Sequence, residues 1–308
     1  FSLEAALIRI GLWVLPGLPR AALRGAARGA GAVAFWGSRR LRRITLANLD
    51  LAYGTALTPG ERRQMGRRTF QNAALVMLDV FWFSRDACRR IRRHVAVERP
   101  VLDALKAGPV IGATAHFGNW ELLSKALGTL GFSHMAVAMP QDNPKADALL
   151  GAGRTLPGVT IIPRQGAIRK LLRALRQGLH VALLLDQNTK PEEGGLFVQF
   201  FGLPCSMSSA AAVLAERAGK PILPLFCRLN GDGNYTIYCR PPWIVARNRS
   251  AATDSARAAS QAIASLFEEE IRGRPNQWLW MYKRWKYKDP AEPDAAYPFY
   301  AKELRRAP

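Results

Sequence analysis

The chain has 308 residues, of which 49% are hydrophobic, so it can bury a substantial core and disorder is not its default state. Its 44 lysines and arginines against 23 acidic residues leave a net charge of +21, which indicates an acidic partner such as nucleic acid, an anionic membrane surface, or an acidic protein or phosphorylated substrate. The four cysteines have no C-x-x-C pair and no metal-ligand spacing, so we expect a reducing compartment, no metal and no cofactor.

The first predicted element is an apolar segment from Ala5 to Leu15, interrupted by Arg9 and ended by Pro16. It is shorter than the roughly 20 apolar residues that a bilayer span needs. We therefore expect residues 1–40 to form a helical membrane-associating extension that lies in the interface, apolar face down and arginines at the headgroups. A helix packed on the protein's own core is the alternative interpretation.

From residue 41 to about residue 93 the apolar residues recur at helical spacing, and Thr58-Pro-Gly-Glu61 is typical of a capping box. From Val95 the spacing of the apolar residues is no longer helical throughout, and short apolar runs alternate with helical segments. We predict strands at 109–115, 135–138, 159–162, 180–185 and 221–226, and helices at 119–130, 145–150, 167–176 and 208–218.

This alternation predicts an α/β fold with a mixed, mostly parallel sheet flanked by helices. The strand at 235–239 is expected to add antiparallel, and residues 256–272 to form a late helix. No low-complexity linker separates the helical opening from the α/β part, so we expect one catalytic domain over 41–290. Residues 291–308 are rich in proline and alanine and are predicted to form a loose tail.

A histidine follows directly on the first predicted strand, at a strand end where α/β sheets place ligands. Glu121 lies five residues after His116, and residues five apart on a helix lie about 140° apart. His116 is therefore expected in the turn before the helix, where Glu121 can approach the imidazole and hold one tautomer. An imidazole with a pKa near 6.5 can take a proton from an attacking hydroxyl, which accelerates a reaction about 10²- to 10⁴-fold. The backbone N–H groups at the start of the helix after Gly118, and the Asn119 side chain, are candidate donors to the oxyanion.

Other polar residues follow the later strands. Arg164 comes directly after the strand at 159–162, where a guanidinium can bind phosphate in a bidentate manner. Asp186 and Gln187 end the strand at 180–185, and Glu193 lies in the loop beyond. We expect these residues at the edge of a substrate site, with one of the carboxylates as a second group that orients the imidazole, although Asp186 could equally cap a loop.

The segment Ala115-His-Phe-Gly-Asn-Trp-Glu-Leu122 closely resembles the H-x4-D/E motif of the lipid A late acyltransferases, the lauroyl and myristoyl transferases of Gram-negative envelopes. The resemblance runs from Arg42 to Lys288. Its further blocks are Ile161-Ile-Pro-Arg-Gln-Gly-Ala-Ile-Arg169, Leu183-Leu-Leu-Asp-Gln-Asn188, Phe200-Phe-Gly-Leu-Pro204 and Trp278-Leu-Trp-Met-Tyr-Lys-Arg-Trp-Lys286.

The resemblance implies an inner-membrane enzyme, peripheral or held by a single anchor, with its active site on the cytoplasmic face. It would transfer a fatty acyl group from an acyl carrier protein thioester to a hydroxyl on a phosphorylated glycolipid, the lipid A precursor. By motif matching, His116 and Glu121 would be the catalytic pair and Arg164 would contact charged substrate. The basic charge favours a phosphorylated acceptor, an acidic carrier protein and an anionic membrane surface.

Three alternatives remain at this stage. The motif supplies the chemistry and not the acceptor, so an acyl-CoA donor, or another glycolipid or aminolipid acceptor, is the nearest one. A nucleic-acid partner fits the charge, but no helix-turn-helix, zinc-finger or ribonucleoprotein motif is evident, and we expect none. A hydrolase that uses Cys205 and His116 is chemically conceivable, yet Cys205 has no visible activating neighbour.

Overall fold

The computed structural model describes residues 3–138, 158–246 and 252–304. Its centre is a seven-stranded sheet with the strand order β1-β9-β8-β2-β5-β3-β4. Strand β9 runs antiparallel to β8, and the other neighbouring pairs are parallel. The strands are β1 (Val95–Val97), β2 (Ile111–Thr114), β3 (His134–Ala138), β4 (Val159–Pro163), β5 (His180–Leu184), β8 (Ile222–Leu229) and β9 (Tyr235–Cys239).

The predicted mixed, mostly parallel α/β sheet is therefore confirmed, including the antiparallel strand at 235–239. The helix expected at 145–150 lies outside the described residues. Strands β6 (Gly195–Phe200) and β7 (Leu203–Ser208) form a hairpin that was not predicted, and the following helix begins at Ala210, later than the predicted residue 208. The tight turn between β6 and β7 is formed by Phe201 and Gly202, and both residues have positive φ angles.

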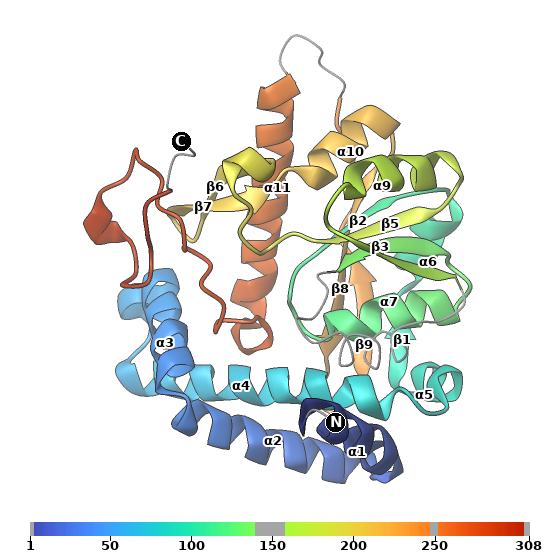
Figure 1. Cartoon of the computed structure of the whole chain (residues 1–308), viewed down its shortest axis with the longest axis vertical. Helices are drawn as coiled ribbons and strands as arrows, with labels where there is room; N and C mark the ends of the chain where they lie inside the picture. The colour runs from blue at the N-terminus through green and yellow to red at the C-terminus, as the bar shows by residue number, and fades with distance from the viewer. Residues whose placement is uncertain (1–2, 139–157, 247–251, 305–308) are drawn as a thin grey trace.

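Helices cover both faces of the sheet (Figure 1). Alternate residues of β8 show the two layers, since Ile222 and Phe226 belong to one hydrophobic cluster and Leu223 and Leu225 to another. The first cluster packs under α9, α10 and α11, and the second under α6 and α7. These helices are α6 (Arg99–Lys106), α7 (Trp120–Thr129), α9 (Ala167–Arg176), α10 (Ala210–Ala218) and α11 (Ala252–Gly273).

Five helices precede the first strand, and α2 lies alongside α4 at the base of the view in Figure 1. The packing is tight, because a Cβ atom on Gly31 of α2 would lie 2.4 Å from the Cα of Gln71 on α4. The predicted capping box at Thr58 and Glu61 opens α4. The helices are α1 (Leu3–Val14), α2 (Arg20–Gly37), α3 (Arg39–Tyr53), α4 (Pro59–Trp82) and α5 (Ala87–His94).

Residues 1–40 are thus more closely joined to the rest of the chain than an appended extension would be. One face of α2 is buried, including Leu23 and Phe35, which are fully covered. Other apolar side chains of this region are exposed, and Trp13 is 82% exposed. In the part of the chain that the structure describes, no helix is both long and apolar enough to cross a membrane.

The expectation of a loose tail after residue 290 is wrong for the part described, up to residue 304. The hydroxyl of Tyr300 donates a hydrogen bond to Asn48 of α3, and the hydroxyl of Tyr297 donates one to the carbonyl of Pro204 on β7, at 3.2 Å. Both tyrosines are buried. Two aromatic residues among prolines and alanines are enough to fasten this segment, because each buries a large apolar ring and satisfies its hydroxyl.

Candidate active site

The turn between β2 and α7 carries His116, as expected from the spacing of the motif. Its backbone is held from the other side by β8, because Asn119 N–H donates to the carbonyl of Cys227 at 2.8 Å. Gly118 has a φ of +59°, and a Cβ atom there would lie 1.9 Å from the same carbonyl oxygen. Only glycine fits this turn, because both the left-handed backbone and the close approach exclude a side chain.

The imidazole of His116 is held by a carboxylate from the neighbouring strand. Its Nδ1 lies 2.7 Å from Oδ1 of Asp186, and its backbone N–H donates to Oδ2 at 3.0 Å. The indole N–H of Trp278 also donates to Oδ2, at 2.8 Å. Since an ionised carboxylate only accepts hydrogen bonds, Nδ1 carries the proton and Nε2 is an acceptor. Asp186, one of the residues expected at the site edge, therefore fixes the tautomer.

The pKa values of this pair shift in opposite directions. Burial by itself would lower the pKa of His116, but the charge and hydrogen bond of Asp186 and the charge of Glu121 outweigh it, so the pKa is raised above its ordinary value. Burial would raise the pKa of Asp186, yet the charge and hydrogen bonds of His116 and the Trp278 hydrogen bond hold it below its usual range. Asp186 is therefore a carboxylate at neutral pH, and His116 is a stronger base than free imidazole.

His116 opens into a cavity of about 470 Å³, which also meets four other predicted site residues: Glu121, Arg164, Gln187 and Glu193. The side-chain amide of Gln187 lies 3.2 Å from Nε2 of His116. Glu121 sits on the first turn of α7, from which its charge acts on the imidazole. The structure thus brings together both members of the predicted catalytic pair, although the carboxylate that bonds Nδ1 is Asp186.

Two charged residues on the cavity wall form an ion pair. Arg164 Nη2 lies 2.6 Å from Oε2 of Glu193, and the two side chains are 41% and 48% exposed. In this half-exposed setting the pair is weakly held, since exposed ion pairs contribute only about 0–1 kcal/mol. An incoming anion can therefore compete with Glu193 for the guanidinium.

The expected role of Gly118 and Asn119 as oxyanion donors disagrees with the structure. The Gly118 N–H donates to the carbonyl of Gln277 at 2.9 Å, and the Asn119 N–H is bonded to β8. The Asn119 side chain is fully buried, where its Oδ1 accepts from Leu122 N–H and caps α7. Its Nδ2 donates to Asp79 at 3.0 Å. The N–H groups of Gly118 and Asn119 and the Asn119 side chain therefore serve the fold, because each already has a partner inside the protein.

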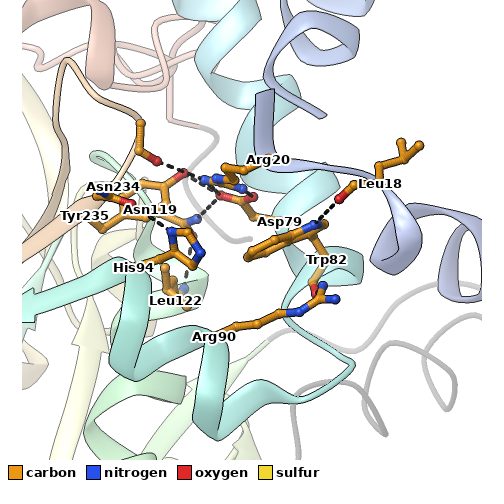
Figure 2. A network of polar contacts seen from close by, with 11 residues as sticks. Leu18, Arg20, Asp79, Trp82, Arg90, His94, Asn119, Leu122, Asn234 and Tyr235 are labelled. Carbon is orange, nitrogen blue, oxygen red and sulfur yellow. Dashed lines mark hydrogen bonds and ion pairs between the residues drawn. The ribbon is translucent and has the colours of Figure 1, made fainter. Parts of the chain in front are cut away.

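Asp79 is the centre of a buried polar network, which Figure 2 shows together with Asn119. Its carboxylate accepts hydrogen bonds from the guanidinium of Arg20 on α2, the hydroxyl of Tyr235 on β9 and the amide of Asn119. Arg20 is also stacked over the ring of Trp82, with its Cζ 5.0 Å from the ring centroid. The network joins the N-terminal helices to the end of the catalytic turn.

The sequence analysis did not identify Asp79 or Trp278 as parts of this region. A signal for Asp79 was present, since it interrupts the apolar run of residues 74–83 on a helix, and a charge there has to be paired. Trp278 was noticed only within a motif block, and nothing in its neighbours indicates that its indole reaches Asp186, 92 residues away.

A second, narrower cavity of about 80 Å³ adjoins the first, and its wall is mainly apolar. It lies between α7 and strands β2, β3 and β5, so it extends from the His116 end of α7 toward the start of those strands. Six residues line both cavities: Trp120, Ser124, Ala136, Val137, Leu183 and Leu184. The apolar cavity therefore lies next to the one that His116 lines.

The cysteine alternative loses support from the same geometry. Cys205 is fully buried on β7, and burial raises the pKa of its thiol to about 11, so it remains protonated at neutral pH. Among the described residues, no group of three or more His, Cys, Asp or Glu side chains could hold a metal ion.

Comparison with known proteins finds similarity to bacterial acyltransferases over most of the chain. Residues 3–287 match the model of the family described as bacterial lipid A biosynthesis acyltransferase. The chain is 25% identical over 283 residues to lipid A biosynthesis lauroyltransferase of Escherichia coli, covering 89% of each chain. It is 27% identical over 191 residues to phosphatidylinositol mannoside acyltransferase of Mycobacterium tuberculosis, covering 59% of this chain and 56% of that protein. The crystal structure of the 1-acyl-sn-glycerophosphate acyltransferase PlsC from Thermotoga maritima aligns with a TM-score of 0.36 and 14% identity, over 77% of this chain and 99% of that one.

Proposed function

The chain belongs to the bacterial lipid A biosynthesis acyltransferase family, and from this premise we propose that it moves a fatty acyl group from acyl carrier protein onto a hydroxyl of a lipid A precursor. The observation that carries the proposal is the unprotonated Nε2 of His116, on the wall of the cavity of about 470 Å³, while buried Asp186 holds Nδ1. Transfer to a hydroxyl needs a base in this position and of this strength.

In the proposed reaction the acceptor hydroxyl binds at Nε2 of His116. As its oxygen attacks the thioester carbonyl, its proton passes to Nε2, and the resulting imidazolium is stabilised by the carboxylate of Asp186. The tetrahedral intermediate then expels the thiolate, which takes the proton back from His116. The products are the ester and the free carrier thiol, so His116 and Asp186 end the cycle unchanged.

The developing oxyanion needs a donor other than the backbone of Gly118 and Asn119. We assign this role to the side-chain amide of Gln187, which lies next to Nε2 of His116 and lines the cavity. When the acceptor hydroxyl donates its hydrogen bond to Nε2 of His116, it replaces the Gln187 amide there. The Gln187 amide can then donate to the oxyanion. Glu121 acts through its charge, which increases the basicity of His116.

The phosphorylated part of the acceptor is proposed to bind Arg164 by displacing Glu193 from the guanidinium. A phosphate offers two charge-assisted hydrogen bonds to the arginine, and the half-exposed ion pair is inexpensive to break. The acyl chain is proposed to extend from the thioester into the apolar cavity beside Trp120.

We further propose that the protein lies on the cytoplasmic face of the inner membrane and contacts anionic lipid with its N-terminal helices. Exposed apolar side chains of α1, including Ile10 at 58% and Trp13 at 82%, together with exposed Arg9, have the composition of an interfacial surface. The alternative is an acyltransferase that uses an acyl-CoA donor, or another glycolipid or aminolipid acceptor. The similarity to phosphatidylinositol mannoside acyltransferase favours another glycolipid acceptor within this alternative.

The direct test measures transfer of radiolabelled dodecanoyl from acyl carrier protein to a phosphorylated lipid A precursor. Wild type is expected to form the product, and His116→Ala to lose about 10²- to 10⁴-fold in rate with little change in thermal stability. His94→Ala is the matched control, because His94 lies on α5 and bonds Asn234 away from the cavity. A His116→Ala rate near wild type would refute the base. Transfer only from acyl-CoA, or only to another glycolipid, would select the alternative.

A further inference from the structure

Ser124 lies where the two cavities meet. It is one of the six residues that line both of them, and it is one helical turn beyond Trp120 on α7. The Trp120 ring contacts the imidazole of His116, with 5.0 Å between ring centroids. In the proposed reaction, the part of an acyl chain nearest its carbonyl would pass Ser124 on the way into the apolar cavity.

The hydrogen-bond donors around Ser124 can be assigned. Nδ1 of His134 lies 3.0 Å from the carbonyl oxygen of Phe132, which can only accept, so Nδ1 carries the proton. Burial lowers the pKa of His134, which keeps the ring neutral. Nε2 is then an acceptor, and the Ser124 hydroxyl, 2.7 Å away, donates its only proton to it.

Ser124 is left as an acceptor that faces the cavity. Within the described residues its hydroxyl bonds to His134 alone, so the lone pairs of Oγ remain available. Donation to His134 also polarises the hydroxyl and strengthens it as an acceptor. A plain methylene chain would cover this oxygen without bonding it, whereas a chain with a hydroxyl at this point would satisfy it. Leaving a buried acceptor unpaired is unfavourable, so the two chains are not equivalent.

We propose that Ser124 recognises a hydroxyl group near the carbonyl end of the donor acyl chain, so that the enzyme prefers hydroxyacyl thioesters to unsubstituted ones. This inference rests on the proposed acyl transfer through His116, and it concerns only the chemical class of the donor. The amide N–H groups of the carrier's pantetheine arm are also donors. Every donor thioester carries these N–H groups, so their contribution cancels in the ratio of kcat/KM between two acyl chains.

The experiment compares kcat/KM for acyl carrier protein loaded with dodecanoyl, 2-hydroxydodecanoyl or 3-hydroxydodecanoyl. In wild type, one of the hydroxyacyl donors is expected to exceed dodecanoyl by roughly three- to tenfold, the effect of one buried hydrogen bond. Ser124→Ala is expected to bring that ratio to about one or below while dodecanoyl transfer persists. Thr114→Val is the matched control, because it removes a different hydroxyl from the wall of the same cavity and should leave the ratio unchanged.

The outcomes separate this inference from the proposed function. If wild type transfers dodecanoyl and discriminates against both hydroxyacyl donors, or if Ser124→Ala keeps the wild-type ratio, the inference is wrong and the acyl transfer stands. If the ratio of hydroxyacyl to dodecanoyl transfer also falls to about one in Thr114→Val, the preference is a property of the whole cavity, and Ser124 does not recognise the hydroxyl. If no thioester is used by wild type, the proposed function itself fails. Thermal melting of each variant shows whether it is folded.

Discussion

Two buried aspartates flank the same turn, and they differ in the group with which each is paired. Asp186 bonds the imidazole and the backbone of His116, and Asp79 bonds the guanidinium of Arg20 and the amide of Asn119. Both carboxylates are almost fully covered, at 3% and 2% exposure. An imidazole can release and regain a proton near neutral pH, but a guanidinium cannot. The first pair can therefore perform chemistry and the second can only hold structure.

The two pairs, His116–Asp186 and Arg20–Asp79, also differ in their surroundings. His116 faces a cavity that a substrate can enter, whereas Arg20 is enclosed by aromatic rings and the β8–β9 turn. Burial strengthens both pairs once they are formed, because fewer waters compete for them. Loss of Arg20 leaves the charge of Asp79 with no water to stabilise it, whereas loss of the His116 imidazole lets water from the cavity reach Asp186. Loss of a partner should therefore reduce activity at one aspartate and stability at the other.

The largest effect is expected at the catalytic pair. Asp186→Asn should lower kcat by about 10²- to 10⁴-fold, because the amide can present its N–H to Nδ1 and select the wrong tautomer, and it cannot stabilise the imidazolium. The measurement is single-turnover transfer from saturating acyl carrier protein thioester. Retention of a rate within threefold of wild type would mean that Asp186 does not support the base.

The converse is expected at the structural pair. Arg20→Ala should lower the free energy of unfolding by about 3–5 kcal/mol, because it leaves the Asp79 carboxylate buried without its cation. Urea unfolding measures this loss. The double variant Arg20→Met with Asp79→Asn should recover part of it, since it removes the orphaned charge while the amide oxygen still accepts from Tyr235 and Asn119. A double variant as unstable as Arg20→Ala would show that packing around α2, and not the orphaned charge, explains the loss.

This pairing also changes how the N-terminal region should be tested. Deletion of residues 1–28 removes Arg20 and the buried Leu23, so we expect it to destabilise the whole chain and not only to weaken membrane binding. A deletion variant that melts at the wild-type temperature would contradict this. Loss of liposome binding after such a deletion is therefore not evidence for an interfacial helix.

The pH dependence of kcat/KM distinguishes the roles of Asp186 and Asp79 in the folded protein. His116 must be neutral to act as base, so kcat/KM should rise with pH through a pKa that Asp186 and Glu121 hold above the ordinary 6.5. In Asp186→Asn, burial still lowers the pKa of His116 and only the charge of Glu121 raises it. The acid limb of the residual activity should therefore move to lower pH. Tyr235→Phe, which alters only the Asp79 network, should leave the limb in place. A limb shifted equally in both variants would indicate general loosening of the turn.

The smallest effect is expected at the surface. Replacing Ile10 and Trp13 by serine should weaken binding to phosphatidylglycerol liposomes by about tenfold, because two exposed apolar side chains no longer enter the interface. The unfolding free energy should be unchanged, since neither side chain is buried. Co-sedimentation with anionic and with neutral liposomes measures the change. Equal binding by wild type and the double variant would place the membrane contact elsewhere.

Much of the site could be predicted because its signals are local. The alternation of strands and helices, the turn at His116 and the polar residues Arg164, Asp186 and Gln187 at strand ends can each be read within about ten residues of sequence. The hairpin at 195–208 was not predicted because β6 is apolar at nearly every position and β7 contains Pro204, a residue rarely found inside strands, so no alternation of apolar and polar residues marks them. The packed tail was missed because its tyrosines find partners far away in sequence.

By itself the sequence determined the α/β class, the position of His116 in the turn and the family of this protein, since periodicity and short motifs depend on neighbouring residues. Only the tertiary structure decided that Asp186 holds Nδ1, that Asn119 bonds Asp79, and that the donors of the turn are already used. These contacts join residues 70 and 40 positions apart. They arise because β2 lies beside β5, and because α4 passes behind the start of α7. Strand order and helix packing come from the burial of whole faces, which no local pattern records.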